Sequence, residues 1–92
     1  MDYLHVHWQH DAADAPVDIY SELDDDRWEV RKVEVYADGT RHYADDWRST
    51  GRTGLSEVPL PSFEELAAQR VLTPAALDGA EFERMWKLAT EG

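Results

Sequence analysis

Residues 28–44 read WEVRKVEVYADGTRHYA and carry the strongest structural signal in the chain. Branched, aromatic and charged side chains mixed over residues 28–36 favour a β-strand, and Asp38-Gly39 follows it directly. An Asp-Gly pair between two β-prone segments is a strong hairpin signal because glycine accepts the positive φ that such a turn needs. We therefore predict a β-hairpin whose second strand covers residues 41–44.

The segment before the hairpin predicts one further strand and a long connection. In residues 3–10 the apolar Leu4, Val6 and Trp8 alternate with polar residues, which is typical of a strand with one buried face. Residues 11–26 are rich in Asp and contain a proline, so we expect a loop that packs partly against the core.

Beyond the hairpin, residues 45–61 predict a surface loop because Gly, Ser and Pro are frequent there. Ser62 and Glu65 have the spacing of a capping box, which predicts a short helix ending near Gln69 or Arg70. The Thr73-Pro74 pair predicts a single helical turn through Leu77, since proline is tolerated at the first helical position.

A second capping box, Asp78 with Glu81, predicts the start of a longer helix that ends near Thr90. Its apolar residues follow at helical spacing and form one stripe: Phe82, Met85, Trp86 and Ala89. Together these elements predict an α+β fold in which a small three-stranded antiparallel sheet packs against two C-terminal helices. We expect residues 1–92 to form a single domain, because a chain of this length supports one modest core.

The net charge restricts the kinds of partner that the chain can bind. Nine Lys and Arg against twenty Asp and Glu give −11, and residues 1–26 hold eight acids without a Lys or Arg. Such a field repels nucleic acids and anionic membranes but attracts a basic protein. The plainer alternatives are that the acids keep the protein soluble or reflect a salt-rich habitat.

The sequence predicts neither catalysis nor a cofactor. It contains no cysteine, and its start resembles no signal peptide, so we expect a cytoplasmic protein without thiol chemistry. No serine lies in a nucleophile-elbow pattern. His5 and His7 share one strand face, but a metal site needs further ligands, so we interpret them as solvent-facing histidines and predict no metal.

Residues 20–39 contain the motif Y-S-E-L-D-x-x-R-x-E-x-R-K-V-E-V-Y-x-D-G. With this motif the chain resembles a family of short uncharacterised bacterial proteins, described as a domain of unknown function. The resemblance covers essentially the whole chain and includes Trp8, His10, the Pro59-Leu60-Pro61 segment and Trp86. It implies a stand-alone bacterial domain of about this length and supplies no catalytic residues.

Our first functional hypothesis is a non-enzymatic protein-interaction module, of the inhibitor or immunity type, that binds a basic protein. Bacterial toxin-neutralising proteins are often short and acidic, because many toxins act on nucleic acid and are basic. Trp47 is poorly explained by periodicity and suits an interface, the alternative being that it folds back over the sheet. The candidate partner-binding residues are Glu22, Asp24, Asp25, Asp26, Asp45, Asp46 and Trp47.

The alternative hypothesis is a small-ligand or peptide-binding domain. Arg27, Glu29 and Arg31 would share one face of a regular strand, and Tyr20 and Trp28 would complete the binding face. A simpler interpretation is a weak network of surface ion pairs with Glu22 or Asp24. Because strand 28–36 has apolar residues on both faces, it is either covered on both sides or bulged near Arg31-Lys32.

Overall fold

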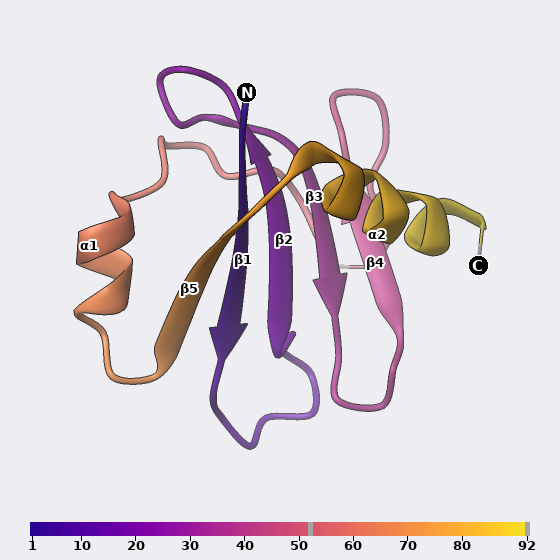
Figure 1. Ribbon diagram of the computed structural model, residues 1–92. Helices are drawn as coiled ribbons and strands as arrows, with labels where there is room; N and C mark the ends of the chain where they lie inside the picture. The colour runs from indigo at the N-terminus through magenta and orange to yellow at the C-terminus, as the bar shows by residue number, and fades with distance from the viewer. Residues whose placement is uncertain (52, 92) are drawn as a thin grey trace.

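The structure is a computed structural model that describes residues 1–51 and 53–91. Its strands form one antiparallel sheet in the order β4-β3-β2-β1-β5, so the predicted three-stranded sheet is wrong (Figure 1). In chain order the elements are β1 (Asp2–Trp8), β2 (Asp18–Leu23), β3 (Glu29–Val35), β4 (Arg41–Ala44), α1 (Phe63–Ala67), β5 (Leu72–Leu77) and α2 (Gly79–Glu91).

The first additional strand, β2, lies within the segment that was predicted to be a loop. It occupies the centre of the sheet and pairs with both β1 and β3. Ser21 and Glu22 are buried in it beside Leu23. Two buried polar residues conceal the alternation of apolar and polar side chains by which a half-buried strand is identified in a sequence.

The second additional strand, β5, replaces the helical turn that the Thr73-Pro74 pair predicts. Pro74 pairs with Val6 of β1 at the edge of the sheet. An edge strand tolerates proline because the missing N–H can lie on the side that has no neighbouring strand. Helix α1 ends at Ala67, slightly before the predicted end.

The other local predictions are confirmed. β3 and β4 form the expected hairpin, and Gly39 has a φ of 89° in its turn. Ser62 and Glu65 form the capping box of α1. At the start of α2, Asp78 accepts a hydrogen bond from the backbone N–H of Glu81 at 2.8 Å.

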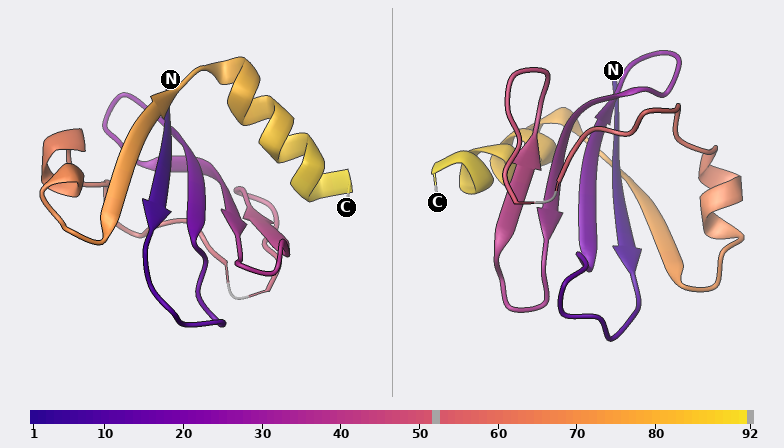
Figure 2. Two further views of the ribbon diagram at one scale, coloured as in Figure 1. Left: turned by 60° about the horizontal axis from the view of Figure 1, so that its bottom comes forward. Right: turned by 180° about the vertical axis from the view of Figure 1, so that it is seen from behind.

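The sheet is covered on both faces. Figure 2 shows α2 crossing one face, while the segment that leads to α1 crosses the other. On the α2 side the rings of Tyr3 and Trp86 flank the fully buried Phe82. On the opposite side, Leu4, Val6, Leu23 and Leu66 form a second apolar cluster. Neither helix of the described residues has the length and apolarity needed to cross a membrane.

Phe82 carries the packing between α2 and the sheet, so we expect Phe82→Ala to reduce the free energy of unfolding by about 3–5 kcal/mol. Phe63→Ala makes the same change in α1, where the side chain is 41% exposed, and should cost less than half as much. Urea denaturation measures both values, and Phe82→Leu gives a milder series if the alanine variant does not fold. Equal losses at the two positions would contradict this assignment of the core.

Candidate functional site

A bulge in β3 determines where its charged side chains point. Arg31 pairs with Glu22 of β2, but Glu29 pairs with the next residue, Leu23, so Val30 has no partner of its own. This extra residue makes a β-bulge. Because side chains of a strand alternate between the two faces of the sheet, the bulge reverses which face the residues before it occupy relative to those after it. Arg31 lies on the α2 side of the sheet and Glu29 on the opposite side, as their contacts below show.

The shared face predicted for Arg27, Glu29 and Arg31 is therefore wrong. Arg27 lies outside β3, in the turn from β2, with a φ of 67°. Its guanidinium donates to the backbone carbonyls of Leu60 and Pro61 and ties this turn to the segment before α1. Arg31 alone contacts α2, whereas Arg27 and Glu29 both contact the segment between β4 and α1.

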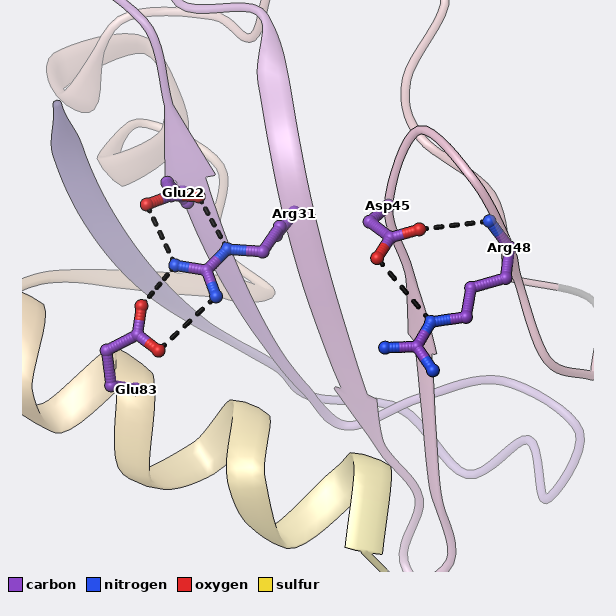
Figure 3. Close-up of polar contacts among 5 residues, drawn as sticks. All are labelled: Glu22, Arg31, Asp45, Arg48 and Glu83. Carbon is purple, nitrogen blue, oxygen red and sulfur yellow. Dashed lines mark hydrogen bonds and ion pairs between the residues drawn. The ribbon is translucent and has the colours of Figure 1, made fainter.

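Arg31 links β2, β3 and α2 (Figure 3). Its Nε and Nη2 atoms donate to the two carboxylate oxygens of Glu22 at 2.6 and 3.0 Å, and the guanidinium also binds the carboxylate of Glu83. The guanidinium carbon lies 4.9 Å from the ring centroid of Phe82 and 5.1 Å from that of Trp86. Bidentate ion pairing and cation–π contacts act together at this one side chain.

The predicted partner-binding residue Glu22 is therefore part of the fold. Its side chain is only 8% exposed. The hydrogen bonds from Arg31 lower the pKa of Glu22, outweighing burial, which would raise it. The same bonds raise the pKa of Arg31. Both groups are charged at neutral pH and neutralise one another.

Two further predicted residues, Asp24 and Asp45, shape the turns in which they lie. One carboxylate oxygen of Asp24 accepts hydrogen bonds from the backbone N–H groups of Asp26 and Trp28, each at 2.9 Å. In the same way Asp45 accepts hydrogen bonds from the backbone N–H groups of Trp47 and Arg48, each at 2.9 Å. Figure 3 shows the bond to Arg48. Such bonds fix the conformation of a turn.

The remaining predicted residues, Asp25, Asp26, Asp46 and Trp47, are exposed on these two turns. Trp47 is 90% exposed, so the alternative that it folds back over the sheet is wrong. Figure 1 shows that the turns after β2 and after β4 lie at the same end of the sheet. We call this end, defined by Asp25, Asp26, Asp46 and Trp47, the acidic end.

On the α1 side, Glu29 is the centre of a buried polar cluster. Its Oε2 atom accepts from the Ser21 hydroxyl at 2.9 Å, and its Oε1 atom accepts from the backbone N–H of Ser56 at 2.7 Å. The ammonium of Lys32 lies 3.2 Å from Oε1 and donates to the Gly54 carbonyl at 2.9 Å.

A cavity of about 360 Å³ opens above this cluster. The cavity is lined by Ser21, Glu29, Lys32 and Ser56 and by apolar side chains. The sequence analysis did not identify Ser21, Lys32 or Ser56 as site residues. Their only signal was the presence of Ser21 and Lys32 in the motif over residues 20–39.

The histidines of β1 have a partner that the sequence did not indicate. The rings of His5 and His7 lie 2.8 and 3.0 Å from the same carboxylate oxygen of Asp18. Burial alone would raise the pKa of Asp18, but the hydrogen bonds from the two histidines lower it further than burial raises it. Within residues 1–51 and 53–91, no three His, Asp or Glu side chains are arranged to hold a metal ion.

The two aromatic residues of the alternative hypothesis also lie apart. Tyr20 stacks on His5 on the α2 side of the sheet, with ring centroids 4.4 Å apart. Trp28 is 42% exposed in the turn at the acidic end. Tyr20 therefore lies on the side of the sheet opposite to Glu29.

Comparison with known proteins identifies the family of this chain but no activity. The model of one family, described as "Domain of unknown function (DUF6881)", matches residues 2–91. No curated protein and no solved structure matches the chain.

Because Glu22 is the buried partner of Arg31, we expect Glu22→Gln to lower the free energy of unfolding by about 3 kcal/mol at pH 7. Glu83→Gln makes the same change at a carboxylate that is 56% exposed and should cost less than about 1 kcal/mol. Chemical denaturation of both variants measures this difference. Similar losses for the two variants would show that burial does not distinguish the carboxylates.

The stability difference between wild type and Glu22→Gln should depend on pH. Since the pKa of Glu22 is lower in the folded state, its ionised form stabilises the fold above the unfolded pKa of about 4.3. That contribution is lost as the pH falls through the folded pKa. The difference in stability between wild type and Glu22→Gln should therefore narrow below about pH 5. A constant difference down to pH 3 would contradict the assignment.

Proposed function

The chain belongs to this family of domains of unknown function, and we propose that it is a non-enzymatic interaction module that binds a basic protein. The observation that carries the proposal is Trp47, which is 90% exposed on a turn whose conformation Asp45 fixes. Tryptophan is enriched among the residues that dominate binding energy at protein interfaces. Since the turn is already ordered, little conformational entropy is lost when a partner covers this ring.

The charge of the acidic end supports the same kind of partner. Asp25, Asp26 and Asp46 are exposed, and they form no ion pair with another described residue. Asp2, at the start of β1, and Asp78, before α2, are exposed at this end as well (Figure 1). An uncompensated negative surface accelerates association with a cationic protein and makes binding sensitive to salt.

We further propose that the protein acts as an inhibitor or immunity protein in the bacterial cytoplasm. The absence of cysteine from the sequence favours a reducing compartment. A small acidic module suits the neutralisation of a basic enzyme because it can cover a surface that binds polyanions. The link from acidity to this biological role is an analogy with other toxin-neutralising proteins.

The test is affinity capture from the source organism followed by titration of the captured partner. We expect a basic protein whose affinity falls at least about thirtyfold with Trp47→Ala, as is usual for a dominant interface residue. The triple variant D25N/D26N/D46N should weaken binding and reduce its salt dependence.

The matched control is D11N/D14N, which removes exposed acids from the loop between β1 and β2 at the other end of the sheet. This control should leave the affinity almost unchanged. A partner without net positive charge, or binding indifferent to salt and to Trp47→Ala, would refute the proposal.

A further inference from the structure

We propose that the cavity on the α1 side of the sheet binds a neutral amphipathic small molecule, with an apolar body and one hydroxyl group. This site is separate from the acidic end and does not depend on the function proposed above. Its volume of about 360 Å³ falls within the range of small-molecule sites, roughly 300–1,000 Å³.

The walls of the cavity select an apolar ligand body. They are formed by Val6 and Ile19 of the sheet, Leu66 of α1, Leu60 before α1 and Leu72 of β5. Leu60 and Leu72 are only partly buried and pack against the apolar cluster beneath them. A ligand body placed here would remove the apolar surfaces of these side chains from water, which is the main source of affinity in such sites.

The polar residues at the floor of the cavity determine which hydrogen bonds a ligand can form there. Both oxygens of Glu29 already accept a hydrogen bond, one from the Ser21 hydroxyl and one from the backbone N–H of Ser56, and Oε1 also forms an ion pair with Lys32. Lys32 has three N–H donors, and among the described residues its contacts are Glu29 and the Gly54 carbonyl. At least one ammonium donor is therefore left, and the Ser21 hydroxyl oxygen still has acceptor capacity.

A ligand hydroxyl matches this arrangement because it can both accept and donate. The ligand hydroxyl would accept a hydrogen bond from a remaining N–H of Lys32 and donate one to the hydroxyl oxygen of Ser21. The Ser21 proton would stay with Glu29, so no existing hydrogen bond of the floor would be broken.

The charges of the floor disfavour an ionised ligand. Glu29 and Lys32 form an ion pair, and their side chains are only 2% and 14% exposed. Since the pair is already neutral as a whole, a ligand carboxylate would face Glu29 and a ligand ammonium would face Lys32. Either ion would be brought into an apolar cavity without a free counter-ion, which is costly.

Three probes with the same apolar body test this inference: phenylbutanol, phenylbutyrate and phenylbutylammonium. Titration followed by amide chemical shifts should show saturable binding of phenylbutanol, with the largest shifts at Ser21, Ser56 and Leu72. We expect the two ionised probes to bind at least about tenfold more weakly. Ser21→Ala should weaken phenylbutanol binding about fivefold, the usual effect of one lost hydrogen bond.

The blocking variant is Leu72→Trp, which fills the cavity and should abolish binding. Val71→Trp is its matched control, since Val71 is exposed, adjacent in sequence and outside the lining of this cavity. If Leu72→Trp does not fold, the Ser21→Ala comparison still decides. Absence of saturable shifts, equal affinity for all three probes, or unchanged affinity in Ser21→Ala would overturn the inference, whatever the outcome for the acidic end.

Discussion

One extra residue in β3, Val30, determines how the charges of the central strands are used. Because of this bulge, Arg31 lies on the α2 side of the sheet and Glu29 lies on the other side. A regular strand would have placed both side chains on one face, where each would have neutralised the other. Instead each face has its own buried ion pair, Glu22 with Arg31 and Glu29 with Lys32.

The two ion pairs contribute to specificity of the fold as well as to its stability. A buried ion pair often stabilises a protein no more than apolar side chains of the same size would. Arg31, however, joins Glu22 of β2 to Glu83 of α2, so it fixes both the register of two strands and the position of the helix. A slip of one residue would move Arg31 to the face that holds Glu29. The acids of the acidic end, Asp25, Asp26 and Asp46, lie in turns and belong to neither pair.

Sequence patterns predicted the elements whose signals are local. The Asp38-Gly39 hairpin, the capping boxes of α1 and α2, and the strand containing Leu4 and Val6 each depend on residues close together in the chain. The missed strands depend on distant residues. Ser21 and Glu22 are buried in β2 because Glu29 accepts a hydrogen bond from Ser21 and Arg31 donates to Glu22. Pro74 fits β5 because that strand is at an edge of the sheet.

The candidate site residues also differ in whether a local sequence signal or a contact between distant residues reveals them. Asp25, Asp26 and Asp46 were identified from the distribution of charge and Trp47 from its poor fit to any periodicity, and all four are exposed. Glu22 was misassigned because its counter-ion follows it by nine residues. The cavity was not predicted, because its walls come from β1, β2, β5, α1 and the segment before α1. Only the folded chain brings those side chains together.

A double-mutant cycle tests most directly whether the bulge separates the two charges of β3. The free energy of unfolding would be measured for Glu22→Gln, Glu29→Gln and Arg31→Met, and for each glutamine variant combined with Arg31→Met. The structure predicts a coupling of at least about 1.5 kcal/mol between Glu22 and Arg31, and less than about 0.5 kcal/mol between Glu29 and Arg31. Strong coupling of Glu29 with Arg31 would mean that both side chains share one face, and would contradict this account of the fold.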